Sequence, residues 1–202
     1  MTRVKVCGIT SPEDALMAAE AGAAAIGLVF WPASPRCVDE RRAAEIVAAL
    51  PPLVGAVGVF VNQVADAAAL AARLRLAAVQ FHGDEAVEDY REFPCPVIKA
   101  VPVRDASARA AAAAVPPGVT VLLDAHDPIR RGGTGAVVDW AVARAIARER
   151  PVILSGGLTA ANVRAAVEAV QPAALDVSSG VESAPGVKDR AKLRAWFAAL
   201  RG

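Results

Sequence analysis

The sequence predicts an α/β protein in which a single (β/α)8 TIM barrel occupies residues 1–202. Two observations predict this fold: short, apolar, strand-like runs alternate with longer alanine-rich amphipathic runs, and each kind of run occurs eight times. Eight β-then-α units in about 200 residues lie near the short end of the range for such barrels. No composition shift or Ser/Gly-rich linker divides the chain, and we therefore expect one domain.

The strand-like runs are short and predominantly apolar, which is typical of parallel strands that are buried on both faces. They cover residues 4–7, 25–30, 55–61, 78–81, 97–101, 119–124, 152–155 and 174–177. The helix-like runs cover residues 12–21, 40–50, 64–74, 85–93, 105–114, 137–148, 160–170 and 188–200. We expect Ser11, Asp39, Asn62 and Thr159 to cap the helices that follow them, and Gly22 to end the first helix in a left-handed conformation.

A doubly wound open sheet is the structural alternative, because it also alternates strands and helices. That fold usually has fewer strands, and its glycine-rich fingerprint directly follows the first strand. Here the first strand leads into Cys7-Gly8-Ile9-Thr10, which has no GxGxxG spacing. The glycine-rich turns follow the seventh and eighth strand-like runs instead, where a barrel commonly binds phosphate.

The composition argues against several classes of protein. The 22 Lys and Arg residues balance 21 Asp and Glu residues, whereas proteins that bind nucleic acid or membrane surfaces are clearly basic. No apolar run reaches the ~18 residues of a membrane helix, and the N-terminal MTRVKVCGIT lacks the apolar core of a signal peptide. Three cysteines without CxxC spacing do not suggest disulfides or a zinc site. We expect a cytoplasmic protein with no nucleic-acid or membrane partner.

Polar residues stand at the carboxyl ends of most predicted strands, where barrel enzymes carry their active sites. We expect them to surround one mouth. In chain order they are Cys7, Arg36 in a proline-rich turn, Asn62, Gln80 and His82, Lys99, Asp124, Ser155 with Gly156 and Gly157, and Asp176 followed by Ser178, Ser179 and Gly180.

Seven segments resemble the phosphoribosylanthranilate isomerase family, in the family's order, from residue 3 to about residue 189. They are VKVCGIT, LVFWPASPR, VGVFVN, VQFHGDE, LLDA with GGTG after it, ILSGGL and LDVSSGVE. The resemblance implies an aldose–ketose isomerase of tryptophan biosynthesis, which is part of aromatic amino-acid biosynthesis. Its reaction is the Amadori rearrangement of N-(5-phosphoribosyl)anthranilate to 1-(2-carboxyphenylamino)-1-deoxy-D-ribulose 5-phosphate, with no metal and no organic cofactor.

By this resemblance Cys7 is the general base and Asp124 the general acid. The chemistry suits both residue types, because ring opening needs an acid at the furanose oxygen and the next step needs a base at the ribose C2. Cys7 must be partly thiolate, which a nearby positive charge would favour. Asp124 must hold a proton near neutrality, which requires burial or a neighbouring negative charge.

The resemblance also implies ligands for the small phosphoribosyl substrate. Arg36 would bind the anthranilate carboxylate, since a guanidinium matches a carboxylate with two parallel hydrogen bonds. His82 and Asp176 would contact the ribose hydroxyls or position the catalytic pair. The segment 131–135 is expected to be a mobile loop over the site. The 5′-phosphate would lie on backbone N–H groups and a short helix after the eighth strand, at Gly156, Gly157, Ser178, Ser179 and Gly180.

Other residues are expected to be structural. Cys37, Cys95 and His126 have the setting of packing or loop residues, and the two histidines lack the spacing of a zinc site. The three tryptophans have the setting of packing residues, with the last two on helices that face the barrel; they are Trp31, Trp140 and Trp196.

Several functions stay open at this point. A pentulose-phosphate epimerase would need paired His and Asp metal ligands, and an indole-glycerol-phosphate synthase would need Lys and Glu as its acid–base pair. A non-catalytic phosphate-binding protein could lose either Cys7 or Asp124, yet both are present. The histidine-pathway aminoaldose is a second substrate that the fold permits. A complete barrel with balanced charge favours a monomer over a homodimer and leaves both open.

Overall fold

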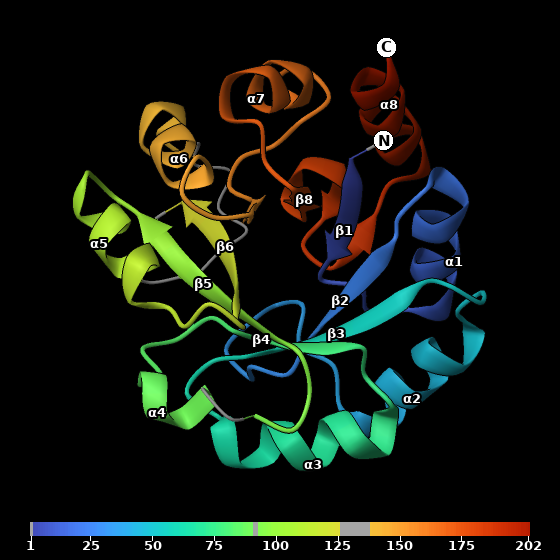
Figure 1. Cartoon of the computed structure of the whole chain (residues 1–202). Helices are drawn as coiled ribbons and strands as arrows, with labels where there is room; N and C mark the ends of the chain where they lie inside the picture. The colour runs from blue at the N-terminus through green and yellow to red at the C-terminus, as the bar shows by residue number, and fades with distance from the viewer. Residues whose placement is uncertain (1, 91–92, 126–137) are drawn as a thin grey trace.

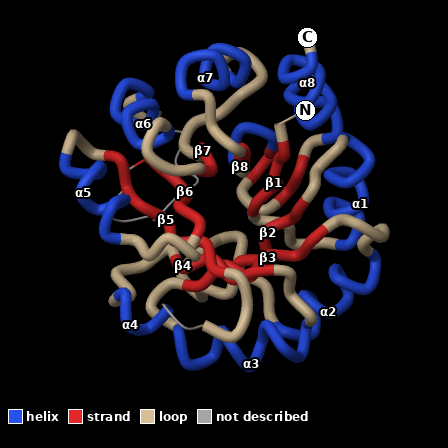
Figure 2. Tube along the Cα trace, in the orientation of Figure 1, coloured by secondary structure: helices blue, strands red, loops and turns tan. Residues whose placement is uncertain are grey.

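The computed structural model describes residues 2–90, 93–125 and 138–202. Eight parallel strands form a closed barrel in the order β1 to β8, and the helices surround it (Figures 1 and 2). The strands are β1 (Arg3–Cys7), β2 (Ala25–Val29), β3 (Gly55–Phe60), β4 (Ala78–Phe81), β5 (Val97–Val103), β6 (Thr120–Ala125), β7 (Val152–Leu154) and β8 (Ala174–Val177). The predicted (β/α)8 barrel is confirmed.

A helix follows each of the eight barrel strands. The helices are α1 (Pro12–Ala21), α2 (Glu40–Ala49), α3 (Val64–Leu74), α4 (Val87–Tyr90), α5 (Ser107–Ala114), α6 (Trp140–Ala147), α7 (Val163–Val170) and α8 (Arg190–Arg201). Between β8 and α8 the chain forms a 3₁₀ turn, η1 (Ser179–Val181), and a hairpin of β9 (Glu182–Ala184) and β10 (Val187–Lys188). The sequence predicts this short helix after β8 but not the hairpin.

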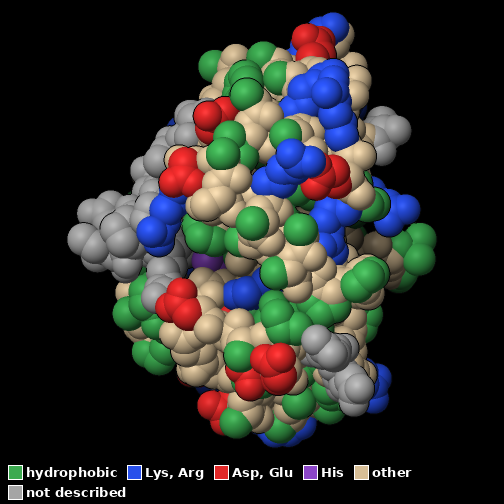
Figure 3. Space-filling model, turned by 60° about the vertical axis from the view of Figure 1, so that its left-hand side comes forward, with side chains coloured by type: hydrophobic (Ala, Val, Ile, Leu, Met, Phe, Trp, Pro, Cys, Tyr) green, Lys and Arg blue, Asp and Glu red, His purple; other side chains and the backbone are tan. Residues whose placement is uncertain are grey.

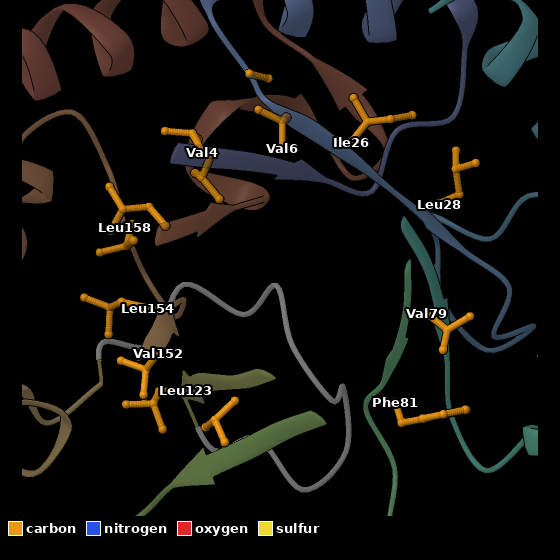
Figure 4. Packing of buried hydrophobic residues seen from close by; sticks show 14 of the residues in the cluster. Val4, Val6, Ile26, Leu28, Val79, Phe81, Leu123, Val152, Leu154 and Leu158 are labelled. Atoms are coloured by element: carbon orange, nitrogen blue, oxygen red, sulfur yellow. The ribbon is translucent and has the colours of Figure 1, made fainter. Parts of the chain in front are cut away.

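Alternation along each strand separates two layers of side chains. On β1, Val4 and Val6 join the large apolar cluster between strands and helices, part of which is drawn in Figure 4. Lys5 and Cys7 alternate with them and therefore point into the barrel. Leu122 belongs to a separate apolar cluster inside the barrel, with partners on β3 and β5. The interior is thus apolar at one level and polar toward the carboxyl ends of the strands.

Pairing of β1 with β8 closes the barrel. Lys5 lies opposite Asp176 in this parallel register, and Cys7 lies opposite Gly27 in the register of β1 with β2. Barrel closure therefore places the carboxylate of Asp176, from the far end of the chain, beside the cation and the thiol of β1 on neighbouring inward-facing positions.

Strand bounds agree with the predicted ones to within two residues, whereas several helices begin later. The predicted starts of α6 and α8 included the turn before each helix, where Asp139 and Asp189 accept hydrogen bonds from first-turn N–H groups. Lys188, predicted to begin the last helix, lies in β10 instead. Among the described residues, the predicted helix 85–93 is reduced to the single turn α4. Glu85 lies outside this helix, because its carboxylate accepts hydrogen bonds from the backbone N–H groups of Asn62 and Gly83.

Two of the four predicted side-chain caps are confirmed. Ser11 and Asp39 accept from the third residue of α1 and α2 respectively, and Gly22 ends α1 with φ 118°. The prediction was wrong for Asn62. Its amide oxygen accepts a hydrogen bond from the backbone N–H of Asp84, after β4, and Gln63 is the residue that precedes α3. The prediction was also wrong for Thr159, because α7 begins four residues later, after Asn162.

Candidate active site

A cavity at the carboxyl ends of the barrel strands holds the candidate site. The surface shows a histidine recessed in a hollow, with a basic side chain nearby (Figure 3). The cavity draws residues from β1, β2, β3, β4, β6, β7 and β8 or from the loops after them. Its lining comprises Cys7, Val29, Trp31, Ser34, Arg36, Val59, Val61, Gln80, His82, Asp124, Ser155, Asp176 and Ser178.

Cys7 lies against a buried ion pair. Lys5 Nζ donates to Asp176 Oδ1 at 2.7 Å, and Ser155 Oγ lies 3.3 Å from Asp176 Oδ2. A Cβ built on Gly27 would lie 2.7 Å from Cys7 Sγ and 3.2 Å from Lys5 Cε. The missing side chain at Gly27 therefore makes the room in which the thiol and the lysine stem lie side by side.

Burial and neighbouring charges have opposite effects on the pKa values of this cluster. Burial raises the pKa of the Cys7 thiol above its ordinary value, while the charge of Lys5 acts to lower it. Burial lowers the pKa of Lys5, but Asp176 and Cys7 more than offset it and the pKa is raised. Lys5 is therefore a charged ammonium that favours the thiolate form of Cys7, as the sequence argument required of a nearby cation.

Asp124 is buried and faces His82 across the cavity. His82 Nε2 lies 3.2 Å from Asp124 Oδ2, and Gln80 Nε2 lies 3.0 Å from His82 Nδ1. Gln80 Nε2 can donate to Nδ1 only in the tautomer that carries its proton on Nε2, and in that tautomer the Nε2–H group faces the carboxylate. Gln80 Oε1 is buried and has no hydrogen-bond partner among the described residues, which leaves this acceptor unsatisfied.

Arg36 is bound to a carboxylate of the chain itself. Its Nε and Nη2 donate to the two oxygens of Glu182 at 2.9 and 2.6 Å. Lys188 Nζ donates to Glu182 Oε1 and to the Cys7 carbonyl oxygen, each at 2.6 Å. Burial raises the pKa of Glu182, but Arg36 and Lys188 outweigh this effect and hold the pKa below its ordinary value. Glu182 is therefore ionised.

The glycine-rich turns after β7 and β8 adjoin each other at the rim. Gly156 and Gly157 have φ of 84° and 62°, a left-handed conformation that favours glycine. A Cβ on Gly180 would clash with the carbonyl oxygen of Leu158, which shows how closely the turn containing η1 approaches the β7–α7 turn. The two turns form one backbone surface.

The predicted site residues fall into two groups. Six of them line the cavity together: Cys7, Arg36, His82, Asp124, Asp176 and Ser178. The other four, Gly156, Gly157, Ser179 and Gly180, lie on the adjoining rim turns and not in the lining. Two residues named as strand ends lie elsewhere: Lys99 binds Glu85 outside the barrel interior, and Asn62 holds the loop after β4.

Sequence reasoning missed four residues of this neighbourhood. Trp31, predicted to pack, lines the cavity, whereas Trp196 is buried on α8 and Trp140 packs on α6 as expected. Lys5 could have been found, because residues two apart on a strand share a face. Lys188 and Glu182 carry no such signal, since their hairpin has only two and three residues per strand.

A second cavity lies at the opposite end of the barrel, between α5 and α6. Its prominent charged residue, Arg150, donates to the carbonyl oxygens of Ala112, Val115, Pro116 and Val119. These bonds satisfy backbone groups of the preceding turn, so that the guanidinium has a structural role there.

Some expectations fall outside the described residues, namely those for the loop 131–135 and for His126. Cys37 is exposed in the loop after β2, and Cys95 is half-buried against the core. Within the described ranges, no group of three or more His, Cys, Asp or Glu side chains is arranged to hold a metal ion. None of the described helices has both the length and the apolar character to cross a membrane.

Comparison with known proteins identifies the family of the chain. The family model of N-(5'phosphoribosyl)anthranilate (PRA) isomerase matches residues 4–199. The chain belongs to this family. N-(5'-phosphoribosyl)anthranilate isomerase of Geobacter metallireducens is 52% identical over 98% of both chains. The enzyme of Azotobacter vinelandii is 50% identical, over 98% of this chain and 97% of its own.

Solved structures of the family superimpose on the whole chain. Phosphoribosyl anthranilate isomerase from Thermotoga maritima has a TM-score of 0.92 and 40% identity, with all of both chains covered. Another structure, a complex with reduced 1-(o-carboxyphenylamino)-1-deoxyribulose 5-phosphate, has a TM-score of 0.89 and 39% identity, again over all of both chains. Membership of this family makes the chain an isomerase enzyme of tryptophan biosynthesis.

Proposed function

We propose that this isomerase performs the Amadori rearrangement of N-(5-phosphoribosyl)anthranilate with Cys7 as general base and Asp124 as general acid. The observation that carries the proposal is that Cys7, at the end of β1, and Asp124, on β6, line the same cavity. A sugar in that cavity would have a thiol and a carboxyl group on different sides, as an acid step followed by a base step requires.

The acid step is supported by the contacts of Asp124. Its Oδ2 faces His82 Nε2, which leaves Oδ1 to hold the proton that is transferred to the furanose ring oxygen. Protonation of that oxygen lets the C1–O bond break, and the nitrogen lone pair forms the iminium. His82 is a positioning residue in this step, because it orients the carboxyl group without contacting the reacting atoms.

The base step is supported by the surroundings of Cys7. The thiolate removes the proton from C2 and becomes a thiol, and the C2–H electron pair forms the enolamine, which tautomerises to the ketone. Lys5 beside Cys7 stabilises the thiolate, and Asp176 holds Lys5 in place. The raised pKa of Cys7 makes the thiolate a stronger base when it forms, while a smaller fraction is ionised at neutral pH.

Substrate binding follows from the groups that surround the catalytic pair. The reduced product analogue in a relative's complex carries a ring carboxylate, ribulose hydroxyls and a phosphate. We assign the carboxylate to Arg36, a hydroxyl group to Gln80 Oε1, and the phosphate to the backbone of Gly156, Gly157, Ser178, Ser179 and Gly180. A cytoplasmic location, a monomeric state and turnover without metal or cofactor stay predictions.

The test follows the loss of anthranilate-type fluorescence when the protein is given phosphoribosylanthranilate without metal. We expect turnover by the wild type and a roughly 10²- to 10⁴-fold lower kcat for Cys7→Ser and for Asp124→Asn, the usual contribution of general acid–base catalysis. Near-normal turnover by either variant would remove that residue from its role. A folded wild type that binds the substrate without converting it would be a binding protein.

A further inference from the structure

Glu182 accepts an unusual number of charged donors for a residue outside the catalytic pair. Its Oε1 accepts from Arg36 Nε at 2.9 Å and from Lys188 Nζ at 2.6 Å, with Gly186 N at 3.4 Å. Its Oε2 accepts from Arg36 Nη2 at 2.6 Å. The side chain of Glu182 is only 4% exposed, and its two cationic partners are 11% and 0% exposed. This carboxylate therefore has a single, fully determined position.

The contact engages one edge of the guanidinium. An arginine has five N–H donors in a planar fork, and Glu182 accepts one from Nε and one from Nη2. Three donors remain, on Nη1 and on the outer side of Nη2. These three form the end of the fork, which is the second edge of a guanidinium able to bind a carboxylate with two parallel hydrogen bonds.

The fold brings these residues together from opposite ends of the chain. Arg36 lies in the loop after β2 and Glu182 begins β9, 146 positions later. A Cβ on Gly8 would clash with Arg36 Cδ, so that the bare backbone after β1 gives the arginine stem its path toward Glu182. Arg36 also lines the cavity that contains Cys7 and Asp124.

We propose that Glu182 is a positioning residue that sets how the substrate carboxylate is recognised. It holds the Nε–Nη2 edge of Arg36, so that the Nη1–Nη2 edge is presented to the carboxylate of an aminobenzoate-type substrate. This inference rests on the proposed function, in which Arg36 binds that carboxylate. The opposite possibility is that Glu182 competes with the substrate for Arg36. Its further bonds to Lys188 and Gly186 argue against release of the carboxylate during binding.

The experiment measures the binding of two ligands to the wild type and to Glu182→Gln. Glutamine has the same shape as glutamate, but its amide N–H group would face an N–H donor of Arg36. One ligand is the reduced 1-(o-carboxyphenylamino)-1-deoxyribulose 5-phosphate, and the other is the same compound without the ring carboxylate. We expect Glu182→Gln to weaken the first ligand roughly tenfold or more, as loss of a charged hydrogen bond does. The second ligand should bind as it does to the wild type, and KM for the substrate should rise more than kcat falls.

Glu85→Gln is the matched control. Glu85 is another buried carboxylate, which accepts from Asn62 N, Gly83 N and Lys99 Nζ and does not touch Arg36. It should change the affinity for both ligands by the same factor. Glu182→Asp keeps the charge but is one methylene shorter, and it should show an intermediate loss that is again confined to the carboxylate-bearing ligand. This variant keeps the test decisive if Glu182→Gln does not fold.

Three results would overturn the inference. Tighter binding of the carboxylate-bearing ligand by Glu182→Gln would make Glu182 a competitor, and equal weakening of both ligands would make its role structural. Adding Glu182→Gln to Arg36→Met should leave the ratio of the affinities for the two ligands as it is in Arg36→Met alone. A further loss of affinity for the carboxylate-bearing ligand would show that Glu182 acts by a route other than Arg36. Failure of the proposed function itself would appear separately, as a wild type that does not convert phosphoribosylanthranilate.

Discussion

Two residues apart on one strand, Lys5 and Cys7 show how a strand can carry both a reactive group and its charge partner. Their side chains share the inner face of β1 because alternation places every second residue there. Gly27 on β2 leaves the space that both side chains use. The charge that favours the thiolate is thus only two positions from it, and Asp176 on β8 keeps that charge in place.

We expect Lys5→Gln to shift the pH dependence of kcat/KM toward alkaline pH. The charge of Lys5 lowers the pKa of Cys7, so that its removal raises the pKa and moves the ascending limb upward. An opposite charge beside an ionisable group typically shifts the pKa by about 1–3 units, and the limb should move by about one unit or more. Activity lost near pH 7 should then partly return in alkaline buffer.

Lys99→Gln is the control for this measurement. Lys99 also forms a buried pair, with Glu85 at 2.7 Å, but it lies away from the cavity. Both substitutions remove one partner of a buried ion pair. Each should therefore lower the free energy of unfolding by about 3–5 kcal/mol. Only Lys5→Gln should displace the pH profile. If both variants shifted the pH profile equally, the shift would come from altered stability rather than from the pKa of the Cys7 thiol.

At the scale of elements, the rim depends on the approach of two turns. The turn after β7 and the turn that contains η1 touch where Gly180 meets the carbonyl group of Leu158. A residue with a Cβ at this position would separate the two turns, and the backbone N–H groups that we assign to the phosphate would no longer point at one location.

We expect Gly180→Ala to weaken phosphate binding. Inorganic phosphate should inhibit the wild type competitively, and its inhibition constant should rise roughly tenfold in the variant, which corresponds to about 1.4 kcal/mol. Gly118→Ala makes the same chemical change in the turn before β6, where a new Cβ would have no atom within 4 Å. Its inhibition constant should equal that of the wild type. Equal constants for Gly180→Ala and the wild type would move the phosphate away from this turn.

Elements differ in how well the sequence predicts them, and the reason is their length. Strands such as β4 and β8, at Ala78–Phe81 and Ala174–Val177, have the predicted bounds because three of the four residues in each are apolar. The hairpin of β9 and β10 was not predicted, because two or three residues per strand carry no detectable period. The predicted helix 85–93 was too long, because acidic residues such as Glu85 are typical of a first helical turn, whereas the described helix α4 is a single turn.

At the scale of the whole molecule, much of the candidate site was predictable as a set of strand ends. A closed barrel brings the carboxyl ends of all its strands to one mouth, so that Cys7, His82, Asp124 and Asp176 had to meet there once the strands were recognised. The internal pairing of Arg36 was not predictable. It joins residues 146 positions apart, and no local pattern reports which charges meet after the chain closes.

The partly buried thiol at the mouth should also affect the stability of the whole barrel in alkaline solution. Burial raises the pKa of Cys7 in the folded protein, whereas an unfolded cysteine titrates near ~8.5. Above that pH the folded state keeps a proton that the unfolded state loses. The free energy of unfolding therefore falls as pH rises, by up to about 1.4 kcal/mol per pH unit for this one group.

We expect Cys7→Ser to reduce this fall, because serine does not titrate in the same range. Thermal unfolding from pH 8 to pH 10 should give Tm values that decline less steeply for Cys7→Ser than for the wild type. Cys37→Ser is the control. Partial burial and the charge of Asp39 also raise the pKa of Cys37, but Cys37 is exposed, so this variant should depart less from the wild type than Cys7→Ser does. Parallel curves for Cys7→Ser and the wild type would mean that Cys7 titrates alike in both states, and the thiol would then lack the buried setting on which its strength as a base depends.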